Sequence, residues 1–197
     1  MTSRPLTKGE IALARTVFGD AIEYGTVYVS DSKFTGFHPP GVAMAPNGNL
    51  FMPGCYSDDY SAEAVYRQSL FIHEMTHVWQ YQNKVLAPMV EAIKLNVKFA
   101  FNYTAAYDYT LDGKKDLIDY NMEQQASIVQ DWFAQKHGGF NPLYSSCQNS
   151  CTDAERKDLQ EKALDKFLAN PKYATRAEFP VAMPGGKTKP KGPEKGK

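Results

Sequence analysis

Two histidines separated by one helical turn, His73 and His77, place the strongest constraint on how this chain can fold. In an α-helix, residues four apart lie on one face, so both imidazoles can reach the same metal ion. Glu74 directly follows the first histidine, and its carboxylate would lie where it can exchange protons with a group beside that ion. The spacing therefore predicts a metal site on a helix, with His73 and His77 as two of its ligands.

Residues 73 to 77 read HEMTH, which fits the H-E-x-x-H pattern of zinc-dependent metallopeptidases. In that pattern the two histidines bind zinc and the glutamate is the catalytic base. A helix is predicted over residues 61 to 83, and its apolar residues occupy most of its circumference, which indicates a central, buried helix. The alternative is a buried helix whose histidines only form hydrogen bonds. Burying polar groups without partners is costly, and a zinc ion would satisfy them.

A catalytic zinc usually has three protein ligands, so the two histidines need a third. The sequence offers several candidates, namely His38, His137, a cysteine or a carboxylate on another helix. Glu123 is favoured because it lies at the edge of an apolar helical stripe, where an unpaired carboxylate would be costly. Gln124 and Gln125 follow it and could orient the ligands. The alternative is that Glu123 lies in a first helical turn because the helix dipole favours a negative charge there.

The remaining patterns predict an α+β fold, mostly helical, with a small β-hairpin or sheet and a central H-E-x-x-H helix, in a zincin-like arrangement. Helices are predicted from the capping box at Thr7 to Phe18, over residues 61 to 83, 88 to 101 and 119 to 136, and from the capping box at Thr152 to about Asn170. A strand is predicted over residues 27 to 30 and a hairpin over residues 41 to 52.

Residues 1 to 183 are predicted to form one domain, and residues 184 to 197 a disordered basic tail of mainly Gly, Pro and Lys. The net charge of zero argues against broad binding to nucleic acid. The sequence has no run of 18 apolar residues that could span a membrane, and its first eight residues lack the apolar stretch of a signal peptide.

Two of the three cysteines, Cys147 and Cys151, lie close together in a polar stretch. Their spacing suits a small disulfide loop in an oxidising compartment, a pair of zinc thiolates, or two free thiols. A second zinc site would need further cysteines or histidines nearby, and none is evident. The choice between a disulfide and free thiols stays open at this point.

Four segments of the sequence carry a family resemblance. They read LTKGEIALARTVFGDAI, GVAMAPNGNLFM, FIHEMTHVWQYQ and YNMEQQASIVQDWF. Through them, residues 6 to 136 resemble the metallopeptidase toxin domain found at the C-terminus of some VgrG spike proteins of bacterial type VI secretion systems and in separate Vgr-related proteins. The resemblance implies that His73, His77 and Glu123 bind zinc and that Glu74 is the catalytic base. Residues 141 to 197 do not match the family pattern.

The resemblance also implies a function, that of a zinc-dependent peptidase delivered as an antibacterial effector into the periplasm of a target cell. The expected partners are a peptide or protein substrate, an immunity protein and a component of the secretion spike. One alternative is a non-catalytic adaptor that docks cargo on the spike, in which four protein ligands would close a structural zinc site. Another is a hydrolase of peptidoglycan cross-links, since the motif serves any amide hydrolysis.

Amide hydrolysis also needs a hydrogen-bond donor for the oxyanion that forms in the transition state. Three tyrosines precede Glu123 in the sequence and are candidates for this donor: Tyr107, Tyr109 and Tyr120. The sequence does not choose among them, because tyrosines in such a stretch are more often core residues.

Overall fold

The structure is a computed structural model, and it describes residues 2–36, 38, 41–88, 90–92, 106–139 and 151–180, together with the backbone of residues 145–147. Its longer helices are α1 (Lys8–Phe18), α2 (Val65–Gln82), α4 (Met122–Lys136) and α5 (Asp153–Ala169). Short 3-10 turns lie at Tyr24–Thr26, Tyr60–Ala62 and Leu117–Asp119. Among the described residues, no helix is long and apolar enough to span a membrane.

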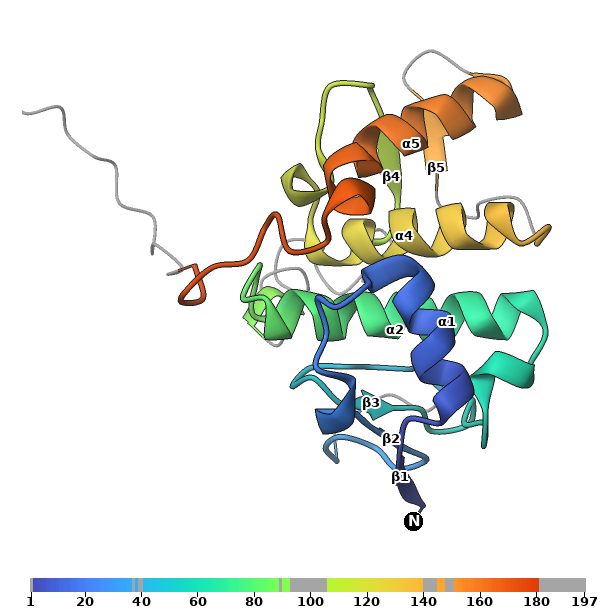
Figure 1. Cartoon of the computed structure of the whole chain (residues 1–197), viewed down its shortest axis with the longest axis vertical. Helices are drawn as coiled ribbons and strands as arrows, with labels where there is room; N and C mark the ends of the chain where they lie inside the picture. The colour runs from blue at the N-terminus through green and yellow to red at the C-terminus, as the bar shows by residue number, and fades with distance from the viewer. Residues whose placement is uncertain are drawn as a thin grey trace, which may run out of the picture.

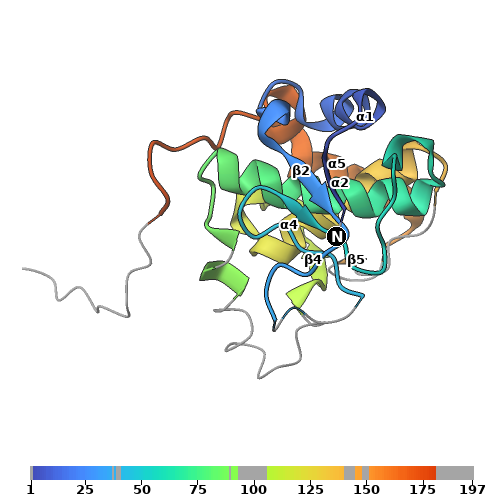
Figure 2. The same ribbon diagram turned by 90° about the horizontal axis from the view of Figure 1, so that it is seen from below.

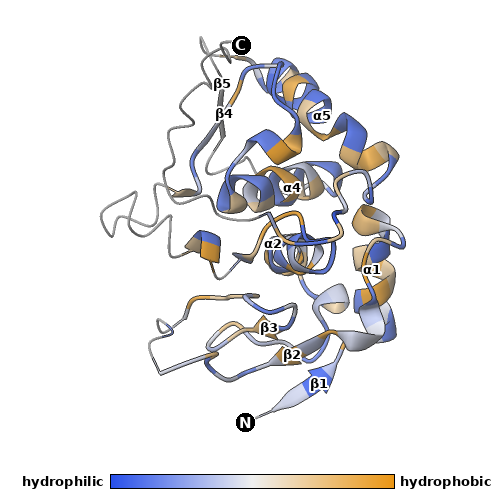
Figure 3. Cartoon of the chain, turned by 90° about the vertical axis from the view of Figure 1, so that its left-hand side faces the viewer, coloured by the Kyte–Doolittle hydropathy of each residue, from blue (hydrophilic) through white to orange (hydrophobic). Residues whose placement is uncertain are grey.

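The helices α2 and α4 pack side by side at the centre of the molecule (Figure 1). The small sheet lies on the side of α2 that faces away from α4, α1 packs on another flank of α2, in front of it in the view of Figure 1, and α5 lies on the far side of α4. Figure 3 looks along α2 and shows it surrounded by α1, α4 and the strands. This central position agrees with the prediction from its apolar circumference.

Three short strands form the sheet beside α2, in the order β1-β2-β3. β1 (Ser3–Pro5) pairs antiparallel with β2 (Tyr28–Ser30), which pairs in parallel with β3 (Leu50–Phe51). Seen from below in Figure 2, these strands cross in front of α2. A separate pair of parallel strands, β4 (Tyr109–Leu111) and β5 (Ser145–Cys147), lies beside α5.

The predicted capping boxes at Thr7 and Thr152 are confirmed, and each opens a helix. α2 begins at residue 65, four residues later than predicted, because residues 60–62 form a 3-10 turn that the Asp59 carboxylate caps. α4 begins at residue 122 because Asn121 is its N-cap and forms a capping box with Gln124. Residues 93–101 of the helix predicted from residue 88 lie outside the described residues, as does the predicted tail.

The predicted hairpin over residues 41 to 52 is much smaller than expected. Its only antiparallel bridge within the described residues joins Met44 and Phe51, through two backbone hydrogen bonds of 3.0 and 2.9 Å. β3 forms its ladder with β2 instead, and the turn is drawn toward β2 because Asn49 Oδ1 accepts a hydrogen bond from Tyr28 N. The Asn-Gly signal therefore predicted the turn and the single antiparallel bridge across it, but not the pairing of β3 with β2.

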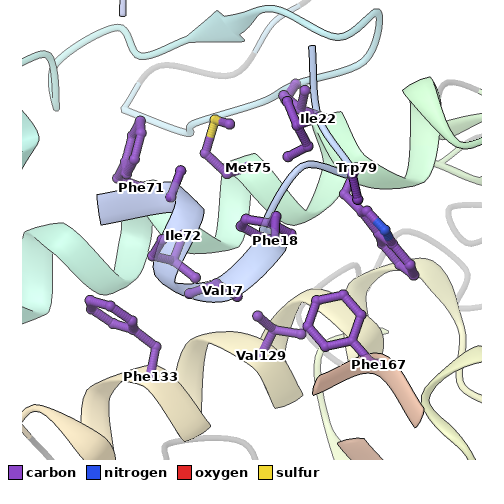
Figure 4. Close-up of a cluster of buried hydrophobic side chains, with 14 of the residues drawn as sticks. Val17, Phe18, Ile22, Phe71, Ile72, Met75, Trp79, Val129, Phe133 and Phe167 are labelled. Carbon is purple, nitrogen blue, oxygen red and sulfur yellow. The ribbon is translucent and has the colours of Figure 1, made fainter. Parts of the chain in front are cut away.

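The core fixes α2 through large side chains on several faces (Figure 4). Trp79 is fully buried; its ring packs edge-on against Phe167 of α5 with centroids 5.0 Å apart, and its Nε1 donates a 2.8 Å hydrogen bond to Pro171 O. Phe18 of α1 contacts the same Phe167 ring at 5.9 Å. Since truncating such a residue typically costs about 3–5 kcal/mol, these contacts hold the motif helix firmly in place.

Candidate metal centre

The packing of α2 against α4 brings the side chain of Glu123 to those of His73 and His77, which lie about 50 residues earlier in the sequence. Nε2 of His73 and Nε2 of His77 each lie 3.3 Å from the Glu123 carboxylate oxygen Oε2. The ligand atoms of all three residues lie within 4.8 Å of one another, and all three side chains are buried. The two imidazole rings are nearly perpendicular, at 82°, so their Nε2 atoms converge on one point. Two nitrogens and a carboxylate oxygen are the donor set of a catalytic zinc site.

A glutamine side chain holds the outer nitrogen of each imidazole. His73 Nδ1 donates to Gln130 Oε1 and His77 Nδ1 donates to Gln80 Oε1, both at 2.8 Å. An amide oxygen only accepts hydrogen bonds, so each Nδ1 carries a proton, and in the neutral form of each ring Nε2 can offer its lone pair to the centre. Both glutamines were missed in the sequence, although Gln80 lies one helical turn after His77, a spacing that could have indicated it.

The charges of the cluster favour a cation at its centre. Burial would raise the pKa of Glu123, but the charges and hydrogen bonds of His77 and His73 outweigh it and hold that pKa far below its usual range. Burial would lower the pKa of His77, but the Glu123 carboxylate outweighs it and raises that pKa. These charges suit the cluster to take up either a proton or a metal ion.

Glu74 lies beside this cluster with its carboxylate almost fully buried. Its Oε2 has no hydrogen-bond partner among the described residues. Burial is the main cause that raises the pKa of Glu74, and the charge of Glu123 adds to it, whereas the charges of His77 and His73 oppose it. A buried carboxylate oxygen calls for a partner, and the described residues supply none to Oε2; a water molecule at a metal would fill this role.

The other candidate ligands lie elsewhere. His38 is buried, but its Nδ1 accepts from Phe34 N at 3.0 Å and its Nε2 lies 2.6 Å from Val42 O, so backbone groups occupy both ring nitrogens. His137 caps the end of α4, and its ring packs on Phe133. In the part of the chain that the structure describes, the cluster has no fourth His, Cys, Asp or Glu member.

The cysteines also stay apart from this cluster. Cys55 is a free, half-buried thiol whose pKa is raised mainly by burial. Cys151 is disulfide-bonded, which supports the disulfide prediction over two free thiols at that position. The side chain of Cys147 lies outside the described residues.

One of the three candidate tyrosines lies beside the cluster. The Tyr107 ring is half-buried and lies 5.8 Å from the His73 ring, tilted by 33°. Tyr109 donates from its hydroxyl to Asp131 at 2.7 Å, and Tyr120 donates to Thr110 O at 3.2 Å. Both of these hydroxyl groups are therefore engaged in bonds away from the histidines, and Tyr107 is the candidate that faces them.

Comparison with known proteins finds a related spike protein and a related solved domain. No protein family profile matches the sequence. Over 136 residues the chain is 43% identical to the type VI secretion system spike protein VgrG2b of Pseudomonas aeruginosa, a match that covers 68% of this chain and 13% of that protein. The solved structure of the effector domain of Pseudomonas aeruginosa VgrG2b is similar, with a TM-score of 0.61 and 34% identity, and the match covers 84% of this chain and 82% of that one. The chain thus spans only a small part of the whole spike protein but most of its effector domain.

Proposed function

Because this chain belongs to the family of the VgrG2b effector domain of type VI secretion systems, we propose that it is a zinc-dependent peptidase that acts as an antibacterial effector in the periplasm of target cells. The observation that carries the proposal is the convergence of His73, His77 and Glu123, with the carboxylate of Glu74 buried beside them. The zinc would be held by Nε2 of each histidine and by the Glu123 carboxylate. When bound, zinc would polarise the scissile carbonyl and lower the pKa of a water ligand toward about 7.

In this proposal Glu74 transfers the proton. Its carboxylate takes a proton from the attacking water and delivers it to the leaving amine. The raised pKa of Glu74 suits the role, because a base whose pKa lies nearer to neutral pH both accepts and releases a proton more readily. Tyr107 lies against the His73 ring and is the proposed hydrogen-bond donor to the oxyanion.

The ligand set favours catalysis over a purely structural role. A structural zinc usually has four protein ligands, whereas a catalytic zinc has three and leaves one position open. Within the described residues the cluster contains three candidate protein ligands, which favours the peptidase over a zinc-stabilised adaptor that docks cargo. Hydrolysis of peptidoglycan cross-links would use the same groups, so digestion of purified sacculi should be compared with digestion of periplasmic proteins.

The disulfide at Cys151 supports the proposed location, because disulfides persist in oxidising compartments such as the periplasm. Delivery would require a component of the secretion spike as a partner. A producing cell would in turn need an immunity protein, and covering the zinc site is the simplest way for such a protein to act.

The decisive test is Glu74→Gln, compared with Glu161→Gln, the same chemical change on an exposed face of α5. Each protein is loaded with zinc, and its products from a periplasmic extract are compared. We expect both variants to bind one zinc and only Glu74→Gln to lose activity, by about 10²–10⁴-fold. Full activity of a zinc-loaded Glu74→Gln variant would refute the peptidase proposal.

A further inference from the structure

A branched chain of four buried hydrogen bonds leads away from His77 and returns to the helix that carries Glu123. Gln80 is fully buried, and its Oε1 accepts from His77 Nδ1 at 2.8 Å. Its Nε2 donates to Met122 O at 3.1 Å and to Gln125 Oε1 at 2.9 Å. Gln125 is fully buried as well, and its Nε2 donates to Tyr120 O at 2.8 Å.

The direction of every bond in this chain follows from its two backbone ends. Met122 O and Tyr120 O are carbonyl oxygens, which only accept, so the amide atoms facing them must be the nitrogens of Gln80 and Gln125. The oxygen of Gln80 must then face His77, and it accepts a hydrogen bond from the Nδ1–H group there. This fixes the neutral His77 in the tautomer whose Nε2 lone pair is free for a metal ion.

The two carbonyl groups belong to the turn that also positions the third ligand. Tyr120 and Met122 flank Asn121, the N-cap of α4, and Glu123 follows in the first turn. The hydrogen bonds that orient the His77 ring therefore end on the same backbone segment that carries the Glu123 side chain. An unpaired amide would be costly in this buried position. The hydrogen-bond chain therefore has one favoured arrangement, in which both glutamine amides have hydrogen-bond partners.

We propose that Gln80 and Gln125 form a positioning relay, which fixes the tautomer of His77 and its distance from Glu123 and thereby sets the affinity of the site for zinc. The inference rests on the proposed function, because it requires that the cluster binds zinc. It goes beyond that function in assigning part of the zinc affinity to two residues that do not touch the metal. Groups that orient a ligating histidine typically contribute 10- to 100-fold in metal affinity.

The test measures Zn²⁺ affinity by competition with a chelator, in the full chain, for Gln80→Met, Gln125→Met and the double variant. Gln80→Met should weaken zinc binding by about 10- to 100-fold. Gln125→Met should weaken it less, and the double variant should bind about as weakly as Gln80→Met alone, because Gln125 acts through Gln80. The absorption spectrum of added Co²⁺ should change in the same order, which reports ligand geometry independently of activity.

Gln135→Met is the matched control, because it makes the same change on the same helix, at a half-buried position about three turns beyond Glu123. We expect its zinc affinity and Co²⁺ spectrum to stay close to those of the parent. Equal losses in Gln135→Met and Gln80→Met would overturn the relay, as would parent-like binding by Gln80→Met. A parent chain that takes up no zinc would instead refute the proposed function, and the relay with it.

Discussion

Zinc uptake at neutral pH should release about one proton from the cluster, and Glu123→Gln should abolish this release. His77 Nε2 and Glu123 Oε2 lie 3.3 Å apart in a buried site. The carboxylate raises the pKa of His77 against the opposing effect of burial, so His77 is an imidazolium at pH 7 when no metal is bound. Zinc binds only the neutral imidazole, so this proton must leave when zinc enters.

The size of the effect follows from the 3.3 Å separation. Two unit charges at that distance interact by about 5 kcal/mol at an effective dielectric constant of about 20. This attraction outweighs the effect of burial and raises the pKa of His77 to about 9. Glu123→Gln keeps the shape of the side chain but removes its charge. Burial, the largest single effect on the pKa of His77, is then opposed mainly by Glu74 and Gln80, so this pKa should fall and leave the ring neutral at pH 7.

Isothermal titration calorimetry in two buffers of different ionisation enthalpy counts the released protons. We expect about one proton for the parent at pH 7 and close to none for Glu123→Gln, measured at zinc concentrations that load the variant. Glu74→Gln is the control, because it removes a nearby carboxylate but keeps the His77–Glu123 pair, and it should still release about one. The reasoning fails if the parent releases none, or if Glu123→Gln releases as many protons as the parent.

Further predictions concern stability, catalysis and location. Without zinc, the His77–Glu123 pair should stabilise the fold most between about pH 4.3 and 6.5. This contribution to the free energy of unfolding should fade as pH rises through the raised pKa of His77, and also as pH falls through the lowered pKa of Glu123. Urea unfolding measured across this pH range should show both decreases in the parent and neither in Glu123→Gln. Tyr107→Phe should keep zinc but lose about 10²–10³-fold in turnover, whereas Tyr120→Phe should keep both zinc and turnover. Equal turnover in the two variants would exclude Tyr107 as the oxyanion donor. Fused to an export signal, the protein should inhibit growth of a Gram-negative host far more than when it stays in the cytoplasm, and equal Glu74-dependent inhibition from the cytoplasm would contradict a periplasmic target.

The local features of the fold could be predicted from the sequence because they depend on neighbouring residues. The capping boxes at Thr7 and Thr152 mark helix starts through side chains three residues apart. The grouping of His73 and His77 on one face follows from helical spacing alone. The start of α2 was predicted too early because residues 60–62 form a 3-10 turn, which has similar residue preferences to the first turn of an α-helix.

The parts that could not be predicted depend on how α2 and α4 align. Glu123 was proposed as a ligand, but its 3.3 Å approach to both histidines is a property of the packed helices. Gln124 and Gln125 were treated alike in the sequence, yet only Gln125 joins the hydrogen bonds that lead to His77. Gln124 caps α4 instead, because it lies three residues after Asn121, where its amide reaches the cap backbone.

The first turn of α4 gives a physical reason why the site can be built from segments so far apart in sequence. Asn121 Nδ2 donates to Ala106 O at 3.2 Å and Gln124 Nε2 donates to Asp108 O at 2.6 Å, so the residues on both sides of Tyr107 are tied to this turn. The same turn carries Glu123 and receives the hydrogen bonds that orient His77. One capped turn thus positions the carboxylate ligand, one histidine and the proposed oxyanion donor together. Since pre-organised groups stabilise a transition state without rearranging, a short rigid turn suits this role better than three independent loops would.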